Sequence, residues 1–309
     1  MRLRYTATIA IAVLAALPAT AQAAPNLAGT SNVSGVPGEM AKGSDDNVWV
    51  TVEGKLARVK PSGNVTEFDP IEFMGIRGIT SGPDGRLWLT KPNNVVEVNP
   101  QNPNNPDQHP IAAITDPRGI TSGPQGKLWA ASGDQLVSFK PDNPANFNAQ
   151  TINGMSARGI AASGGKLWIA DAGSGRIIKV TPKAGDDEVK RYLTGGMPQE
   201  VSSGPNGGIA YANPGTDPQT VGRVSAGGHP NTTNVPMSDP FGIDFMNDGR
   251  WWFAEFAKSK LGILTQGGAV SQFDLPNNSG PRYLTKGKGG TLYVSLETSE
   301  KIARVTGIN

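Results

Sequence analysis

Four arginines recur at equivalent places in a repeating chain, and their type and spacing suggest a site for anions or carbonyl groups. Arg77 and Arg118 open the nearly identical segments RGITSGPDGRLW and RGITSGPQGKLW, and Arg158 and Arg282 hold the same place in more divergent copies. A guanidinium group presents a fixed fork of donors that matches carboxylate, phosphate and carbonyl oxygens. Four such groups around one opening would attract a ligand that carries these oxygens.

The equivalent positions in the other repeats are Gly38, Gln199 and Phe241, and we assign Gln199 and Phe241 to the ligand-binding set together with the four arginines. The positions three or four residues after the Trp or Tyr of each repeat form a second set and converge on the same opening. The charged residues among them are Lys91, Asp171, Glu255 and Glu297. Glu39 and Glu200 come one position after the first set. The alternative interpretation is that the arginines pair with these acids and hold neighbouring repeats together. The sequence leaves both interpretations open.

An aromatic residue marks the same point of each repeat and sets the repeat length. The seven are Trp49, Trp88, Trp129, Trp168, Tyr211, Trp252 and Tyr293. Their interval of about 41 residues is typical of a four-stranded blade of a β-propeller. No segment has helical periodicity, whereas short alternating segments recur in each unit. The sequence therefore predicts an all-β, seven-bladed propeller of four-stranded blades, with the aromatic residues packed between blades.

The second repeat predicts where the strands of a blade lie. Residues 78–81 form the inner strand, residues 82–85 (Gly-Pro-Asp-Gly) form a tight turn, and residues 86–90 and 95–98 form the next two strands. The outer strand is expected at residues 111–114. The last repeat ends soon after its third strand, at residues 302–306. We therefore expect residues 26–33 to supply its outer strand and close the ring.

The N-terminal segment is typical of a secretory signal peptide. Arg2 and Arg4 precede a short apolar run, and Ala-Gln-Ala at 21–23 fits a cleavage site. We expect residues 1–23 to be removed, which leaves one propeller domain at 24–309, secreted or periplasmic in a bacterium. Loss of both arginines would take the formal charge from +2 to 0. We therefore expect no nucleic-acid partner and, after cleavage, no membrane partner. We also expect a monomer.

The absence of cysteine excludes thiol catalysis and thiolate metal sites. The two histidines, His109 and His229, each precede a proline in outer-strand or loop segments. We interpret both as surface residues. Residues 186–188 (Asp-Asp-Glu) lack the alternating ligands and the glycine of a calcium loop, so they predict a solvated turn.

The repeat unit P-x-G-I-T-x-G-P-D-G-x-L-W-x-x-E followed by K-I-G-R-I-T resembles the virginiamycin B lyase family. The chain matches this unit in residues 77–88, in residues 241–255 with 260–265, and in residues 292–297 with 301–306. The similarity extends over the whole chain after the signal peptide. It implies a seven-bladed propeller whose site lies at the mouth of the central channel.

The resemblance also implies a chemistry and a set of residues. Members of the family open a cyclic depsipeptide by elimination across the ester C–O bond, with Mg²⁺ and a histidine base. Glu297 matches the glutamate that lies near the metal. Arg282 stands where the resemblance implies the essential histidine, Phe241 replaces a second histidine, and Gly38 replaces an aromatic residue. Because arginine stays protonated at physiological pH, Arg282 cannot serve as the general base.

Three functions remain open on the sequence. The first is an exported propeller that binds a small or peptidic ligand at the arginine-rich mouth, its family chemistry lost. The second is a metal-dependent carbon–oxygen lyase or hydrolase that opens a cyclic ester; it would use Glu297 and Mg²⁺, with Glu255 or Glu200 as the base. The third is a calcium-dependent lactonase, which requires acidic and amide ligands at a place where the chain gathers arginines.

Overall fold

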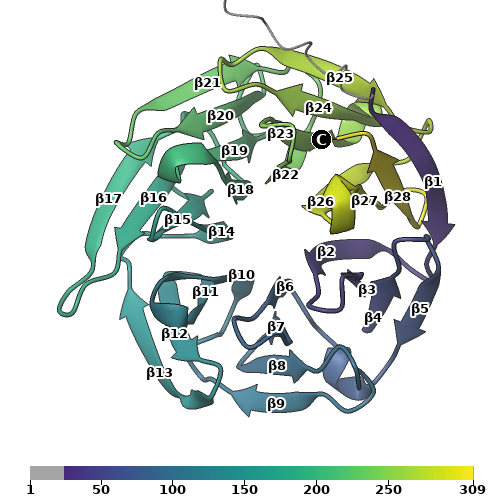
Figure 1. Cartoon of the computed structure of the whole chain (residues 1–309). Coiled ribbons are helices and arrows are strands. Elements are labelled where there is room, and N and C mark those ends of the chain that lie inside the picture. Colours follow the sequence, from purple (N-terminus) through teal and green to yellow (C-terminus); the bar gives the residue numbers. More distant parts are fainter. Residues whose placement is uncertain (1–23, 309) are drawn as a thin grey trace, which may run out of the picture.

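The computed structural model describes residues 24–308, which form seven four-stranded antiparallel sheets arranged as blades around a central channel (Figure 1). This confirms the all-β, seven-bladed prediction. The proposed signal peptide, residues 1–23, lies outside the described residues. In the described part of the chain, no helix has the length and apolar character needed to cross a bilayer.

The strands follow one another from the channel outward in each blade. Blade 1 holds β2 (Pro37–Lys42), β3 (Val48–Val52), β4 (Lys55–Val59) and β5 (Val65–Phe68); blade 2 holds β6 (Gly78–Ser81), β7 (Leu87–Lys91), β8 (Asn94–Val98) and β9 (Asp107–Pro110). Blade 3 holds β10 (Pro117–Ser122), β11 (Leu128–Ser132), β12 (Gln135–Lys140) and β13 (Asn143–Thr151); blade 4 holds β14 (Ala157–Ser163), β15 (Lys166–Asp171), β16 (Arg176–Thr181) and β17 (Glu188–Leu193).

Blade 5 holds β18 (Glu200–Ser203), β19 (Ile209–Asn213), β20 (Thr220–Val224) and β21 (Pro230–Asn234); blade 6 holds β22 (Pro240–Phe245), β23 (Trp251–Glu255), β24 (Lys260–Leu264) and β25 (Val270–Asp274). Short 3-10 turns occupy η1 (Ile71–Phe73), η2 (Pro124–Gly126), η3 (Pro205–Gly207), η4 (Phe256–Lys258) and η5 (Lys288–Gly290).

Blade 7 is built from both ends of the described chain. It contains β26 (Pro281–Lys286), β27 (Leu292–Leu296) and β28 (Lys301–Thr306), and its outer strand is β1 (Asn26–Asn32). β1 runs antiparallel to β28, with Asn26 opposite Thr306 and Asn32 opposite Lys301. The edge of β28 therefore has a hydrogen-bonded neighbour, as the third strands of the other blades do.

The core lies between blades, where the predicted aromatic residues pack. Trp49 of blade 1 is fully buried in a cluster with Ile79 and Leu87 of blade 2, and Trp168 of blade 4 packs with Val201 of blade 5. Large buried aromatic side chains such as Trp49 typically contribute about 3–5 kcal/mol each to folding stability. In blades 1, 2 and 6 the aspartate of the preceding turn accepts a hydrogen bond from the indole N–H. The turn and the core residue thus stabilise each other.

One predicted strand is wrong. The outer strand of blade 2 is β9 at Asp107–Pro110, and residues 111–114 form a buried turn instead. Ile111 N donates to Asn93 O and Asn93 N donates to Ile114 O, so the two isoleucines anchor this turn against β8. Both side chains are fully buried. Their apolar spacing reflects anchoring of a connection, whereas the exposed outer strand itself is polar.

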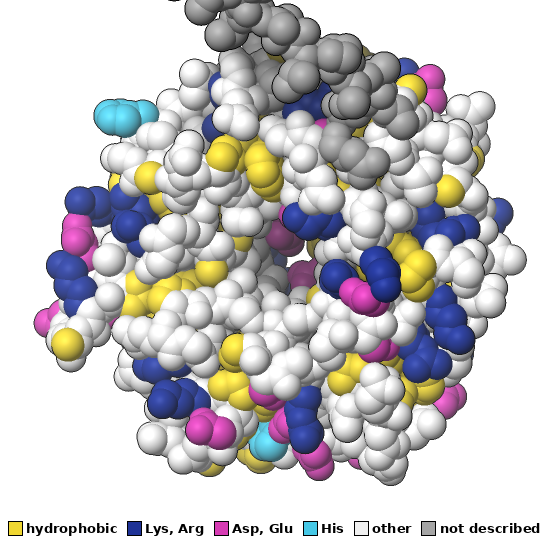
Figure 2. All heavy atoms as spheres, in the orientation of Figure 1, with side chains coloured by type: hydrophobic (Ala, Val, Ile, Leu, Met, Phe, Trp, Pro, Cys, Tyr) yellow, Lys and Arg dark blue, Asp and Glu magenta, His cyan; other side chains and the backbone are white. Residues whose placement is uncertain are grey.

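All inner strands begin at one face of the disc. The same face carries the ends of the second strands and the connections from each outer strand to the next blade. We call the channel end at this face the mouth. The channel opens at the centre of the disc, and on the face seen in Figure 2 basic and acidic side chains border the opening.

Candidate functional site

The inner strands are bulged where they meet the mouth. In five blades the pairing with the second strand shifts register at this point, as between Pro37 and Met40 or between Pro281 and Leu284. Side chains of the second strands bind the backbone that the shift releases. Ser295 Oγ accepts a hydrogen bond from Tyr283 N (2.8 Å), and Asp171 Oδ1 accepts one from Ser156 N (2.8 Å). The bulges of blades 3, 4 and 7 lie at Arg118, Arg158 and Arg282.

Arg282 lies at the centre of the densest cluster at the mouth. Its guanidinium carbon lies 3.6 Å from the ring centroid of Phe241 and 5.6 Å from that of Phe256. Its Nε is 3.7 Å from a carboxylate oxygen of Glu297, and its Nη1 is 4.0 Å from one of Asp239. These separations are longer than hydrogen bonds, so the donors of Arg282 stay available. The side chain is 27% exposed to solvent.

The other predicted binding residues are held separately. Arg118 pairs with Asp116 (3.0 Å), and Gln199 donates to Met197 O (3.1 Å). Arg77 is exposed, and Arg158 has a buried Nε that makes no hydrogen bond within residues 24–308. Of the predicted set, direct contacts between described residues join Phe241, Arg282 and Glu297. The arginines therefore share the mouth by position but do not form one contiguous cationic cluster.

Glu255, a predicted base, is directed away from Arg282. Its Oε2 accepts a hydrogen bond of 2.7 Å from Gln272 of β25, the outer strand of the same blade, and Lys258 lies 3.7 Å from Oε1. The side chain is fully buried, and burial raises its pKa. These contacts bind Glu255 into blade 6.

The two histidines lie apart from the mouth. His109 is on β9, where its Nε2 is 2.8 Å from Glu97 and its ring stacks on Trp88 with centroids 5.5 Å apart. His229 is exposed in the connection between β20 and β21, which lies at the opposite face. No imidazole is thus in place to take a proton from a ligand at the mouth.

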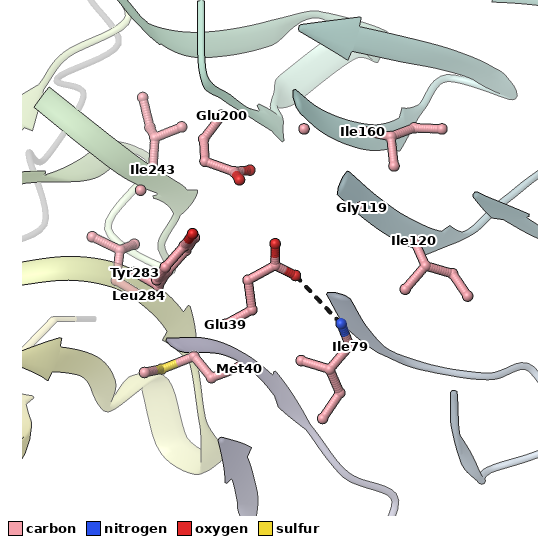
Figure 3. A pocket seen from close by; sticks show the side chains of 12 residues that line it. Glu39, Met40, Ile79, Gly119, Ile120, Ile160, Glu200, Ile243, Tyr283 and Leu284 are labelled. Carbon is pink, nitrogen blue, oxygen red and sulfur yellow. Dashed lines mark hydrogen bonds between the residues drawn. The ribbon is translucent and has the colours of Figure 1, made fainter. Parts of the chain in front are cut away.

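One step below the arginine positions, the inner strands contribute a ring of four glycines and three polar residues. We call it the carboxyl layer, and its members are Glu39, Gly78, Gly119, Gly159, Glu200, Gly242 and Tyr283. Six of them, all except Gly78, line a cavity of about 140 Å³ in the channel. Figure 3 shows the carboxyl groups of Glu39 and Glu200 extending into this space from opposite walls, with the Tyr283 hydroxyl beside them.

The carboxyl layer has shifted acidities. Burial raises the pKa of Glu39 well above its usual range; the neighbouring Glu200 raises it further, and a hydrogen bond from Ile79 N (3.3 Å) opposes this. Burial raises the pKa of Glu200 to about 8 against the effects of the Val201 amide and of Arg282. Burial and the charges of Glu39 and Glu200 raise the pKa of Tyr283. Desolvated titratable groups that share a cavity in this way are typical of functional sites.

Sequence reasoning missed Tyr283. It considered Glu39 only as a partner of the arginines, and Glu200 as such a partner or as a base. A signal was present, because the position after each predicted arginine position is glycine in four repeats and Glu, Glu or Tyr in the other three. In a propeller this position faces the axis.

Large apolar side chains are exposed in four of the seven connections between blades. Among the described residues the large exposed hydrophobics are Val36, Ile71, Met74, Leu193, Met197 and Met237. All six lie at the end of an outer strand or in its connection to the next inner strand, so they belong to the mouth face. Methionine is common on surfaces that accommodate varied ligands. We call these six residues the apolar rim.

The residues at the mouth do not fit the magnesium site that Glu297 implied. Burial raises the pKa of Glu297, and the guanidinium group of Arg282 lowers it. That group occupies the space between Glu297 and Asp239 where a divalent cation would have to bind. No group of three or more acidic, histidine or cysteine side chains suited to a metal occurs in the described part of the chain.

Comparison with known proteins places these features in a family. The model of the virginiamycin B lyase family matches residues 146–308, more than half of the chain. A virginiamycin B lyase of Nocardia farcinica is 28% identical over 119 residues, which is 38% of this chain and 40% of the relative. The matched segment thus spans less than half of that relative.

Two solved structures of similar fold cover nearly the whole chain. A streptogramin B lyase structure has a TM-score of 0.79 at 20% identity and covers 92% of this chain and 98% of its own. A catalytically inactive histidine-to-alanine variant of virginiamycin B lyase from Staphylococcus aureus, with quinupristin, has a TM-score of 0.78 at 16% identity, and the match covers 92% and 99% of the two chains. At these identities the likeness shows the fold.

Proposed function

Because the chain belongs to the virginiamycin B lyase family, we propose that it is an exported propeller that binds a small or peptidic ligand at the mouth and has lost the elimination chemistry. The observation that carries this proposal is the setting of Arg282. Its guanidinium group is stacked on Phe241, partly exposed, and beyond hydrogen-bond distance of both neighbouring acids. A ligand carbonyl or carboxylate oxygen would satisfy these donors.

The loss of elimination chemistry follows from the same residue. Elimination needs a group that accepts a proton, and a guanidinium group stays protonated at physiological pH. Arg282 also stands between Glu297 and Asp239 with its own positive charge. Arginine in place of histidine at this position therefore supplies no proton acceptor, and its positive charge repels a metal cation.

The apolar rim favours a ligand with a substantial hydrophobic body. Exposed apolar groups around a polar centre are the usual composition of a binding surface. Met237 is 83% exposed and lies two residues before Asp239, which faces Arg282. A peptide or cyclic peptide offers both apolar side chains for the rim and backbone carbonyls for Arg282.

Quinupristin is a suitable probe, since a related lyase structure contains it. We expect calorimetry to detect binding, and mass spectrometry to find the compound unopened with or without Mg²⁺. Arg282→Ala should weaken binding by tenfold or more, about the value of a charged hydrogen bond. Arg86→Ala is the matched control, because Arg86 pairs with Glu97 in a turn at the opposite face. Equal affinity of Arg282→Ala and wild type would refute the proposal.

The second candidate is a carbon–oxygen lyase or hydrolase that opens a cyclic ester, and the raised pKa of Glu200 favours it. A carboxylate with a pKa of about 8 is a stronger base than an ordinary one and faces the channel. Opening of quinupristin by the wild type, lost in Glu200→Gln, would establish this function. The absence of any opened product from pH 7 to 9 would exclude it.

A further inference from the structure

The carboxyl layer encloses a space that its glycines keep open. A Cβ atom at Gly159 would lie 2.6 Å from Glu200 Oε2, and one at Gly78 would lie 3.4 Å from Glu39 Oε2. A side chain at Gly159 would therefore crowd the carboxyl group of Glu200, and one at Gly78 would contact that of Glu39. The cavity of about 140 Å³ has room for roughly four waters at ~30 Å³ each, or for a short alkyl chain with a polar end.

The polar groups of this space have unused acceptor capacity. Glu39 accepts one long hydrogen bond, of 3.3 Å, from Ile79 N. The Tyr283 hydroxyl makes no hydrogen bond to any residue from 24 to 308, although Tyr283 N and O both bond to Ser295. These side chains are half-buried and face the cavity, so their acceptors are open to a partner that donates several hydrogen bonds.

Negative charge exceeds positive charge within the layer. The charged groups that face Glu200 and Tyr283 are Glu39 from β2, Arg282 from β26 and Glu297 after β27. The strands β6, β10, β14 and β22 contribute glycines and aliphatic side chains to the wall. Arg77, Arg118 and Arg158 lie one position above the layer, and Arg282 is the guanidinium group whose charge acts on Glu200 and Tyr283. When Glu39 and Glu200 are ionised, the layer itself is negative, and a cation within it would be stabilised.

The walls discriminate between kinds of cation. Met40, Ile79, Ile120, Ile160, Ile243 and Leu284 line the cavity beside the carboxyl groups. Calcium prefers six to eight oxygen ligands, which two carboxyl groups and one phenol do not provide. An alkylammonium group matches both features, because its methylenes pack on aliphatic walls and its three N–H donors match three acceptors.

We propose that the carboxyl layer binds a primary alkylammonium group, with Glu39, Glu200 and Tyr283 as its acceptors. This deepens the proposed function, since the group would belong to the ligand held at the mouth. The ligand class is then an apolar peptide or small molecule that carries a basic amine, such as a lysine-like side chain, next to a carbonyl or carboxylate group. The amine enters the channel, and the oxygen stays with Arg282.

The test uses n-butylammonium as the probe and n-butanol as its neutral counterpart, in calorimetric titrations of the whole protein. We expect n-butylammonium to bind and n-butanol not to bind. Affinity should be about tenfold higher at pH 9 than at pH 6, because the pair gains charge in that range while the amine, with a pKa near that of lysine at ~10.4, stays protonated. Glu39→Gln with Glu200→Gln should abolish binding. Glu188→Gln, at an exposed outer strand, should leave it unchanged.

Three outcomes would overturn the proposal. The first is equal binding of n-butylammonium by wild type and the double variant, and the second is equal binding of n-butanol. The third is stabilisation by Ca²⁺ or K⁺ through Glu39 and Glu200 without any effect of n-butylammonium, which would assign the layer to an inorganic cation. The quinupristin experiment tests the mouth separately, so a protein that binds n-butylammonium but not quinupristin refutes the proposed function and keeps this site.

Discussion

Glu200 and Asp244 are acidic residues of neighbouring inner strands, and the protein holds them in opposite ways. Asp244 accepts hydrogen bonds from Ser202 Oγ (3.1 Å), Phe245 N (2.8 Å) and Lys286 N (3.0 Å), and so joins β22 to β18 and β26. Glu200, in the carboxyl layer, has only the Val201 amide and the charge of Arg282 to stabilise its ionised form.

The difference in hydrogen bonding distinguishes a buried carboxylate that holds the fold together from one that is available to a ligand. Burial raises the pKa of Asp244 too, but three hydrogen bonds oppose the shift. Its carboxylate oxygens accept hydrogen bonds from three blades, so Asp244 links neighbouring blades of the propeller. The carboxyl group of Glu200 faces a cavity and has acceptors to spare, which makes it available to a ligand. Predictions that treat the two differently therefore test the assignment of the site.

Asp244→Ala should have the largest effect on stability. It leaves two backbone amides and a serine hydroxyl of three blades without their acceptor, at a cost of about 3 kcal/mol in the free energy of unfolding. Glu200→Gln should be neutral below pH 8, where the carboxyl group is protonated, and stabilising above it, because it removes a desolvated charge. Urea denaturation of both variants measures this. A comparable loss of stability in the two variants would mean that Glu200 also links neighbouring blades.

The pH dependence of stability should separate the same two groups. In the folded state Glu200 has a pKa of about 8, so between pH 4.5 and 8 the folded protein binds more protons than the unfolded chain. Stability is therefore full at the acidic end and falls as the pH rises, by roughly 1–3 kcal/mol from pH 5 to pH 8.5. Urea midpoints across this range measure it.

The control for this slope is the variant that carries both Glu39→Gln and Glu200→Gln. It should keep only the smaller slope that Asp244, Glu255 and Glu297 contribute, since burial also raises the pKa of each of them. A slope as steep as that of wild type would place the titrating groups elsewhere.

The fold could be predicted from sequence because its signals repeat. Each blade repeats the glycine turns and the aromatic residue that wedges between sheets, as Trp49 does against Ile79. The outer strand of blade 2 was predicted at the wrong residues because a polar outer strand has no alternating apolar pattern. Ile111 and Ile114 have the spacing of a strand, but they anchor a turn.

The site was predictable in part, because the sequence specifies positions but not pairings. It placed Arg282, Phe241 and Glu297 at one mouth, and they are in contact there. It could not foresee that Arg118 would pair with Asp116 or that Gln272 would bind Glu255. Those outcomes depend on side-chain directions in bulged strands and on contacts across a blade, which repeat spacing does not encode.

Gly159→Ala tests whether the open space beside Glu200 matters. The new Cβ would lie 2.6 Å from Glu200 Oε2 and 2.9 Å from the backbone oxygen of Gln199, so the carboxyl group and the neighbouring backbone must move. We expect a loss of about 1 kcal/mol in stability from overpacking, and weaker binding of n-butylammonium in calorimetry. Gly185→Ala is the matched control, because nothing lies within 4 Å of its Cβ position. Unchanged binding in Gly159→Ala would mean that the amine does not occupy this space.

Arg118→Ala should have the smallest effect on stability and on ligand affinity. It compares a paired arginine of the mouth with Arg282, whose donors are free. Arg118 pairs at 3.0 Å with Asp116, which is 53% exposed, and such pairs contribute about 0.5 kcal/mol or less. Urea denaturation should find little change, and quinupristin affinity should fall far less than in Arg282→Ala. Equal losses of affinity in the two variants would mean that the ligand spans the whole mouth and that the arginine ring predicted from the sequence acts as one site. A loss confined to Arg282→Ala would limit recognition to blades 6 and 7, where the guanidinium group stacks on Phe241 above the carboxyl layer.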